Sequence, residues 1–420
     1  MRSESKAICP RNSLATRSAA TSCLATMGKA CKQKNSGITA FTASHRIVQR
    51  VTSSSALLCG TLAVACASPS PLGTPPLPTA LSSSSRTGTI VSDTVPAPSL
   101  AQSLFGAPAR VPVAVYLPPG YQATGPHHPV LYMLHGFPRT LTGEPVTDSH
   151  TRWLKSPFGA RALDSLIAAG TIGALLVVVP KAVGRYGEAS FYTNSPSGDW
   201  EGFVTRDLVQ YVDHHYQTLP HSASRGIAGA SGGGYGALRL AMRHPTTFGA
   251  VYAQSPCCLG IGAFEYDEGA WRAALQLQRP EQLPDTVHPM TNVLVGLAAA
   301  FSPNPNHPPF YFDWPFKLVE GVRRPLEPGY SRWAANALLE HLQQYAANLR
   351  RLRAIGFDAG RADQYTFIPV TTRALSQALT ALGIPHTFEE YEGDHVNRRG
   401  ERTVTRLLPF IAAALRFEDK

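Results

Sequence analysis

The stretch "GIAGASGGGYGALRLAMRHP", Gly226 to Pro245, changes from strand to helix around a single serine. Its first residues continue a short buried-strand pattern, and the residues after Gly234 carry apolar side chains at helical spacing until a proline ends the pattern. Ser231 therefore lies at a strand-to-helix turn and fits the pattern G-x-S-x-G, in which glycines permit a bend too tight for Cβ atoms. This pattern predicts a nucleophile elbow, which exposes the serine hydroxyl at the start of the helix.

A phosphate-binding turn is the alternative for this stretch, because glycine-rich turns before a helix also bind anions. The stretch does not fit G-x-x-x-x-G-K-[ST], and no acidic residue follows at the spacing of a dinucleotide-binding unit. A nucleophilic serine is the better interpretation if the chain also supplies a base and an acid.

Two late segments supply these groups. A serine hydroxyl is a weak nucleophile at neutral pH, so a histidine must accept its proton and a carboxylate must orient that histidine. Among the histidines after Ser231, only His395 comes just after the end of a predicted strand. Asp363 lies in the loop after another strand, whereas Asp358 lies inside that strand and Asp394 is adjacent to the histidine. We predict a triad of Ser231, Asp363 and His395, with Asp358 and Asp394 as alternative acids.

Two backbone N–H groups should stabilise the negative charge of a tetrahedral intermediate. Gly232 follows the nucleophile directly, and Phe137 in "LYMLHGFP" follows an early strand, so these two residues are the expected donors. We expect His135 in the same segment to be a structural turn residue that transfers no proton. The residues expected to line the substrate pocket are Tyr192, Asn194, Trp200 and Tyr235.

The rest of the chain alternates between continuous apolar strands and amphipathic helices, which predicts an α/β fold with a mostly parallel central sheet covered by helices on both faces. Residues 259–330 interrupt this alternation with a segment dense in proline and aromatic residues. Insertions after strand ends lie over the ligand crevice of such a sheet. We therefore predict a cap-like insertion here, with a surface excursion that makes no substrate contact as the alternative.

The N-terminal residues 1–67 have the features of an export signal. Two arginines precede the apolar run "SALLCGTLAVACAS", which is too short to span a bilayer and has the length of a signal-peptide core. The segment offers a cleavage site after Ala67, and "LAVAC" resembles a lipobox in which Cys66 would be lipidated and tether the protein to a membrane. A buried apolar segment is the alternative. Residues 68–86 are rich in proline and serine and are expected to be a linker before a catalytic domain at 87–420.

Charge and cysteine content exclude several other classes. The net charge of +10 comes mostly from residues 1–67, which hold nine Lys or Arg residues and one acid, so the remaining chain is close to neutral and shows no basic face for nucleic acid. Five of the seven cysteines lie in the same leader. Cys257 and Cys258 are expected to pack in the core, with reactive thiols as the alternative, and no metal-ligand spacing or cofactor motif is found.

Several motifs together resemble the bacterial putative-esterase family, which groups esterase D-type enzymes, antigen 85 mycolyltransferases and enterochelin esterase-like proteins. The resemblance extends from Thr87 to Phe417, and the motifs that carry it are "VYLPPGY", "PVLYMLHGF", "FYTNSPSGDWEGF", "GASGGGYGALRLAMRHPTTFGAV", "FDAGRAD" and "GIPHTFEEYEGDH". It implies an α/β-hydrolase fold with Ser231, Asp363 and His395 in the triad positions. The chain departs from the family where Ala230 and Gly232 replace the His and Met of G-H-S-M-G-G. It also has Asp199 where many members have Asn.

These observations predict an exported serine hydrolase that cleaves small-molecule carboxylic esters through an acyl-enzyme on Ser231. Two alternatives stay open at this point. An acyltransferase of the mycolyltransferase type would pass the acyl group to a sugar or alcohol with the same triad. A surface protein with this fold could also bind without turnover. The sequence indicates no oligomeric state.

Overall fold

The computed structural model describes residues 87–137, 148–186, 190–262, 268–285 and 289–418. The chain is divided into two units, Met1–Ser70 and Pro71–Lys420, and every described residue belongs to the second. The predicted leader, the linker and Cys66 lie outside the described residues. None of the helices in the described ranges is long and apolar enough to cross a bilayer.

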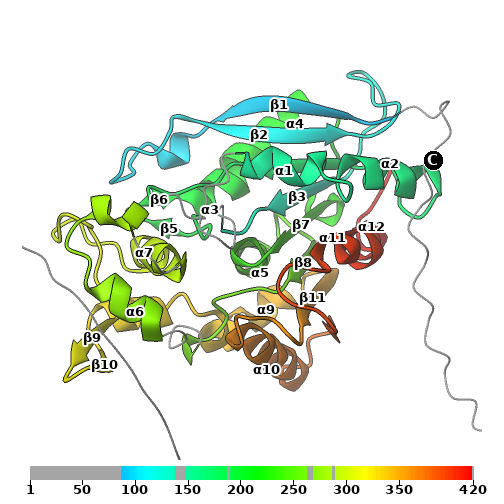
Figure 1. Ribbon diagram of the computed structural model, residues 1–420. Helices are drawn as coiled ribbons and strands as arrows, with labels where there is room; N and C mark the ends of the chain where they lie inside the picture. Colours follow the sequence, from blue (N-terminus) through cyan, green and yellow to red (C-terminus); the bar gives the residue numbers. More distant parts are fainter. Residues whose placement is uncertain (1–86, 138–147, 187–189, 263–267, 286–288, 419–420) are drawn as a thin grey trace, which may run out of the picture. The chain divides into compact units, whose positions relative to one another are not determined.

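The second unit is built on an eight-stranded sheet with the order β1-β2-β4-β3-β7-β8-β11-β12 (Figure 1). The β1–β2 and β2–β4 pairs are antiparallel, and every other pair of neighbours is parallel. The strands are β1 (Thr89–Pro96), β2 (Arg110–Leu117), β3 (Val130–Leu134), β4 (Leu176–Pro180), β7 (Arg225–Ala230), β8 (Ala250–Gln254), β11 (Ala354–Gly360) and β12 (Thr387–Tyr391). The mostly parallel sheet expected from the apolar strand pattern is confirmed.

Helices cover both faces of this sheet, because alternate side chains of each strand point to opposite sides. In β3, Val130, Tyr132 and Leu134 belong to one apolar core, and Leu131 and Met133 belong to another. The helices of the first core include α4 (Val209–His215), α5 (Gly232–Arg243) and α10 (Phe367–Ala381). Those of the second are α1 (Ser149–Lys155), α2 (Ala160–Ala168) and α12 (Leu408–Ala414).

Shorter elements connect these parts. They are β5 (Asn194–Ser195), β6 (Gly198–Asp199), α3 (Trp200–Gly202), α9 (Ala346–Leu349), α11 (Arg399–Arg402), the 3-10 segments Pro98–Leu100, Ser222–Ser224, Pro280–Asp285 and Leu338–Tyr345, and the π-helical segments Phe203–Leu208 and Thr403–Leu407. The π segments continue directly into α4 and α12, so each forms one longer helical stretch with its neighbour.

The long connection between β8 and β11 contains the predicted cap-like insertion. It consists of α6 (Glu268–Leu275), α7 (Pro289–Phe301), a hairpin of β9 (Phe316–Val319) and β10 (Val322–Pro325), and α8 (Gly329–Ala334). Its aromatic residues pack on one another: the Trp333 ring lies 5.7 Å from Trp271 and 5.8 Å from Phe301, and its indole N–H donates to Ser302. The aromatic density seen in the sequence therefore forms an apolar core within the insertion. Contact with a substrate stays a prediction.

The parallel register brings the segments that contain Ser231, Asp363 and His395 to one edge of the sheet. Leu134 at the end of β3 pairs with Gly229 of β7, Ala230 pairs with Gln254 of β8, and Gln254 pairs with Asp358 of β11. The segments that follow β3, β7, β8, β11 and β12 therefore begin at the same carboxyl edge. This edge is where α/β folds place their ligand sites.

Candidate active site

Ser231 occupies the turn between β7 and α5 with φ 55° and ψ −121°. A positive φ is uncommon for a residue with a side chain and costs free energy, so neighbouring groups must stabilise it. The Ser231 N–H donates to the carbonyl of Gln254 at 2.9 Å, and the Ser231 carbonyl accepts from the N–H of Tyr235, also at 2.9 Å. The strained turn is thus held by the next strand on one side and by the first turn of α5 on the other.

The glycines of the turn allow α5 to approach the sheet closely. A Cβ atom at Gly233 would collide with the carbonyl groups of Leu134 and His135 at the end of β3. Backbone atoms cannot move aside as a flexible side chain can, so this position accepts only glycine. The glycine requirement follows from packing between α5 and the end of β3.

Asp363 and His395 form a buried pair. Nδ1 of His395 lies 2.7 Å from Oδ2 of Asp363, and the two residues are 6% and 3% exposed. The other carboxylate oxygen of Asp363 accepts the backbone N–H of Tyr365 at 2.9 Å. The Tyr365 ring also packs against the imidazole in a T-shaped arrangement, with ring centres 5.0 Å apart and planes at 89°. A carboxylate only accepts hydrogen bonds, so the network assigns the proton to Nδ1 and leaves Nε2 able to accept another.

Ser231 lies at the same sheet edge as this pair. Strands β7, β8 and β11 are consecutive neighbours, Asp363 comes three residues after β11, and His395 comes four residues after β12. No hydrogen bond joins the Ser231 hydroxyl to His395 in this structure, although both residues are described. Catalytic hydrogen bonds are often long in unliganded enzymes and shorten when substrate binds.

The two alternative acids have other partners. Asp358 is buried inside β11, where it accepts the hydroxyl of Tyr252 at 3.0 Å and Nε of Arg402 at 2.9 Å. Burial raises the pKa of Asp358, and Arg402 offsets part of that rise. Asp394 accepts two N–H groups of the loop that follows it, each at 2.7 Å, and these bonds lower its pKa. Only Asp363 of the three contacts the ring of His395 through a hydrogen bond.

Both expected oxyanion donors come from segments at this edge. Gly232 is the first residue of α5, and the N–H groups of a first helical turn have no acceptor within the helix. Phe137 follows β3 by three residues and is partly exposed. The partial positive charge of a helix start favours a developing anion near Gly232.

A comparison with known protein families identifies one family for most of this chain. The family model described as "Putative esterase" matches residues 107–399, which is more than half of the chain. The chain belongs to the putative-esterase family. The matched range includes Ser231, Asp363 and His395, and the resemblance expected from the sequence motifs is confirmed.

Relatives of this putative-esterase chain match it over shorter ranges. "Esterase Rv1288" of Mycobacterium tuberculosis is 29% identical over 148 residues, which cover 34% of this chain and 28% of the relative. "S-formylglutathione hydrolase" of Mus musculus is 29% identical over 189 residues, covering 38% of this chain and 60% of the relative. The chain therefore matches less than two thirds of the length of either relative.

Solved structures of esterases show the same fold. A "ferulic acid esterase" is 21% identical with a TM-score of 0.54, covering 78% of this chain and 99% of that one. An S-formylglutathione hydrolase from Agrobacterium tumefaciens is 17% identical with a TM-score of 0.50, covering 79% and 97%. The family member described here has the α/β-hydrolase fold, as the motifs implied.

Three of the four residues expected to line the substrate pocket are buried. Tyr192 is 0% exposed and its hydroxyl donates to the carbonyl of His135 at 2.8 Å. Tyr235 is also 0% exposed and donates to the carbonyl of Asn336 at 2.8 Å, while Trp200 is 3% exposed. Asn194 is exposed. Substrate contact by these residues stays a prediction, and the contacts of the three aromatic side chains favour packing roles.

Cys257 and Cys258 follow β8 close to the elbow and are free and buried. Their sulfur atoms lie 2.7 Å apart, and the Cys257 N–H donates to the Ser231 carbonyl at 3.4 Å. Burial raises the pKa of the Cys258 thiol, with a further contribution from its neighbour. In the part of the chain that the structure describes, no group of three or more His, Cys, Asp or Glu residues could hold a metal ion.

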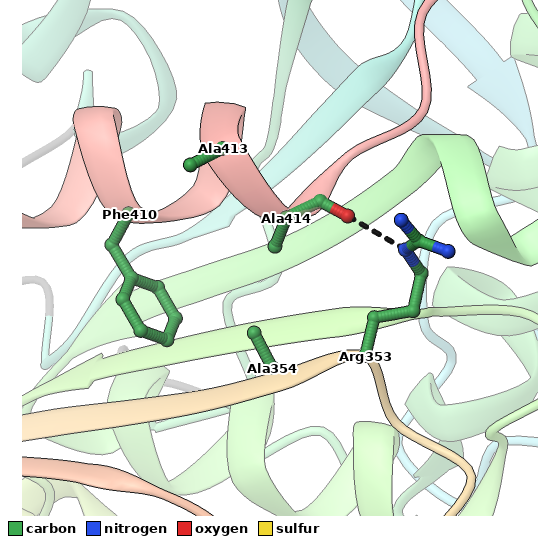
Figure 2. Close-up of a pocket in the computed structure, with 5 residues that line it drawn as sticks. All are labelled: Arg353, Ala354, Phe410, Ala413 and Ala414. Atoms are coloured by element: carbon green, nitrogen blue, oxygen red, sulfur yellow. Dashed lines mark hydrogen bonds between the residues drawn. The ribbon is translucent and has the colours of Figure 1, made fainter.

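A hollow of about 530 Å³ lies elsewhere in the fold (Figure 2). Its lining residues are Arg353, Ala354, Phe410, Ala413 and Ala414, and Nε of Arg353 donates to the carbonyl of Ala414 at 2.7 Å. Ala354 begins β11, whereas Asp363 follows the other end of that strand. The hollow is thus at the opposite sheet edge from the triad candidates, and we assign it no part in the chemistry.

Proposed function

We propose that this chain is an exported serine hydrolase that cleaves carboxylic esters through an acyl-enzyme on Ser231. The observation that carries the proposal is the buried hydrogen bond of 2.7 Å between Asp363 and His395, at the sheet edge where Ser231 adopts its strained turn. Membership of the putative-esterase family supports the reaction class. We also propose that the substrate is a small-molecule ester.

In the first half of the reaction, Oγ of Ser231 attacks the carbonyl carbon while Nε2 of His395 accepts the hydroxyl proton. Asp363 keeps the proton on Nδ1 and stabilises the imidazolium that forms. The N–H groups of Phe137 and Gly232 donate to the carbonyl oxygen as it becomes negative. His395 then returns its proton to the leaving alkoxide, and the alcohol departs from the acyl-enzyme.

In the second half, water takes the place of the alcohol. His395 accepts a proton from the water as its oxygen attacks the acyl carbon, and a second tetrahedral intermediate forms with the same two N–H donors. Collapse of this intermediate breaks the bond to Oγ of Ser231, which regains its proton from His395. The carboxylic acid is released and the three side chains return to their starting states.

Labelling with a fluorophosphonate probe and turnover of esters with short to long acyl chains test this proposal. The wild-type protein should label at Ser231 and hydrolyse at least one ester. Ser231→Ala should do neither, whereas Ser255→Ala is the matched control because Ser255 follows the neighbouring strand β8. A folded wild-type protein that neither labels nor turns over would favour the binding protein without catalysis.

Product analysis in the same assay identifies whether water or an alcohol accepts the acyl group. The proposed hydrolase should release free acid when trehalose or a simple alcohol is added in excess. A transfer product as the main product would instead support the acyltransferase. Both outcomes use the same triad, so product analysis separates them where labelling cannot.

The export part of the proposal has its own test, because the residues concerned lie outside the described ranges. Intact-mass analysis of protein recovered from cells should show either cleavage after Ala67 or a lipidated Cys66 at the mature N-terminus. A full-length chain recovered from the cell interior would contradict export.

A further inference from the structure

Two successive peptide groups after β3 are held by side chains. The carbonyl of His135 accepts the hydroxyl of Tyr192 at 2.8 Å. The carbonyl of Gly136 lies 2.8 Å from Nδ1 of His135 itself. These are the last peptide groups before Phe137, whose N–H is one of the two proposed oxyanion donors.

The partners of His135 determine which nitrogen carries its proton. The backbone N–H of Ala182 donates to Nε2 at 3.0 Å, so Nε2 must be unprotonated. The Gly136 carbonyl can only accept, so Nδ1 must carry the proton. Burial is the main cause that lowers the pKa of His135 to about 4; the hydrogen bond to the Gly136 carbonyl opposes this shift, and the nearby His150 and Lys181 add to it. The ring is therefore neutral near pH 7, with one nitrogen donating and the other accepting.

The bond to Gly136 has a direct consequence for Phe137. The Gly136 carbonyl and the Phe137 N–H belong to the same planar peptide group, and in a trans peptide they point in opposite directions. A side chain that fixes the carbonyl oxygen therefore fixes the direction of that N–H as well. A freely rotating peptide group would have to reorient at the moment when negative charge develops, and preorganised donors avoid this cost.

The same peptide group lies directly against the elbow. A Cβ atom at Gly136 would be 2.8 Å from the carbonyl oxygen of Ala230 and 3.2 Å from Cβ of Ser231. The segment held by His135 is thus packed closely against the Ala230 carbonyl and the Cβ atom of Ser231. A small rotation of the Gly136–Phe137 peptide would change the position of the N–H relative to a substrate carbonyl at Ser231.

We propose that His135 is a positioning residue for the oxyanion hole. Its Nδ1–H orients the Gly136–Phe137 peptide so that the Phe137 N–H faces the developing oxyanion, and its Nε2 fixes the ring by accepting from Ala182. It transfers no proton and touches no substrate. This role rests on the proposed function, because it concerns the stabilisation of the tetrahedral intermediate formed by Ser231.

Two matched variants separate this role from simple packing. The amide of His135→Asn can donate from a position near Nδ1 but loses the acceptor for Ala182. The longer amide of His135→Gln can accept from Ala182 at a position near Nε2 but loses the donor to Gly136. Each variant removes one of the two hydrogen bonds, so a structural role predicts similar effects for both.

The positioning role predicts different effects. His135→Gln should lower kcat by about 10²–10³ with little change in KM, which is the size of effect seen when one oxyanion donor is lost. His135→Asn should stay within about tenfold of wild type. The inhibition constant of an alkyl boronic acid, whose adduct with Ser231 is a tetrahedral anion, should rise in parallel with the fall in kcat. His128→Asn is the control, because His128 also has a ring nitrogen near a backbone carbonyl, 3.3 Å from that of Ala174, and precedes β3.

Three outcomes would overturn the role of His135. The role is contradicted if kcat falls equally in the Asn and Gln variants, if it falls further in the Asn variant, or if the Gln variant keeps the wild-type kcat. A measurement on the wild-type protein covers the case in which a variant fails to fold: the ¹⁵N shifts of the His135 ring should report the neutral Nδ1–H form, and the Nε2–H form would refute the proposal. A wild-type protein without turnover or labelling refutes the proposed function itself, and active wild type with an unaffected Gln variant refutes only the role of His135.

Discussion

Replacing Asp363 by asparagine should move the ring proton of His395 from Nδ1 to Nε2. The Oδ1 atom of Asp363 accepts the N–H of Tyr365 at 2.9 Å, and Oδ2 lies 2.7 Å from Nδ1 of His395. Asparagine has one oxygen and one NH₂ group, and only the oxygen can accept from Tyr365. The NH₂ group is then turned toward Nδ1 and donates to it, which moves the ring proton to Nε2. In that form His395 cannot accept the proton of Ser231.

The size of the effect follows from the loss of the base. In a Ser-His-Asp triad, the wrong imidazole tautomer lowers kcat by about 10⁴ while the geometry stays intact. A factor of 10⁴ corresponds to about 5 kcal/mol of transition-state stabilisation. The fold should survive because Asn fills the same volume and keeps the hydrogen bond from the Tyr365 N–H.

The assay is steady-state hydrolysis of the best ester found for wild type, together with the rate of fluorophosphonate labelling. Both rates should fall in Asp363→Asn, while circular dichroism and the melting temperature show a folded protein. Asp394→Asn is the matched control, since Asp394 is adjacent to His395 but accepts N–H groups of its own loop. It should keep activity within a few-fold of wild type. Loss of less than about tenfold in Asp363→Asn, or a 10⁴-fold loss in Asp394→Asn, would refute this assignment of the acid.

Three further predictions concern stability and reactivity. Glu201 is 5% exposed and paired with Arg239 at 2.5 Å, so Glu201→Gln should lower the free energy of unfolding by about 3–5 kcal/mol in a denaturant titration. Burial alone would raise the pKa of Glu201, but its hydrogen bonds hold the pKa well below the usual range. The contribution of ionised Glu201 to the free energy of unfolding is therefore complete above about pH 4.3 and is lost as pH falls below that value. Acid unfolding should shift to higher pH in the variant. Gly233→Ala should prevent soluble folding because the methyl group meets backbone, whereas Gly262→Ala, with nothing within 4 Å, should melt like wild type. Burial raises the pKa of Cys258, so iodoacetamide at pH 8 should modify it slowly in the native protein and quickly after unfolding, as followed by mass spectrometry.

Much of the fold follows from patterns within short segments. Continuous apolar runs predict the positions of β3, β4 and β8, because a strand buried on both faces carries apolar residues at nearly every position. Details inside helices are harder to predict. The helical stretch that begins at Trp200 contains a π-helical segment at Phe203–Leu208, which the period of its apolar residues does not indicate. Helix α10 begins at Phe367 and includes Pro369, because that proline lies within the first turn, where its missing N–H is tolerated.

The sequence predicts the candidate site residues wherever chain order and strand ends leave few candidates. The position of Asp363 after the strand favours it over Asp358 as the acid, and its hydrogen bond to His395 agrees with that choice. Burial of the aromatic candidates could not be predicted in the same way. From sequence alone, Tyr192 and Tyr235 could line a pocket or pack in the core. Only the packing around α5 shows that both side chains are buried.

The backbone around Ser231 and Gly136 explains why local preference and final structure disagree at this edge. Serine does not favour a positive φ, so the turn depends on Gln254 of β8, which is distant in sequence, and on the first turn of α5, which follows Ser231 directly. Gly136 in turn needs His135 to fix the peptide that faces the elbow. Hydrogen bonds from three separate segments therefore maintain one strained arrangement of backbone groups. In the reaction proposed above, such an arrangement would stabilise the short-lived negative charge of the tetrahedral intermediate, because its dipoles are oriented before that charge appears.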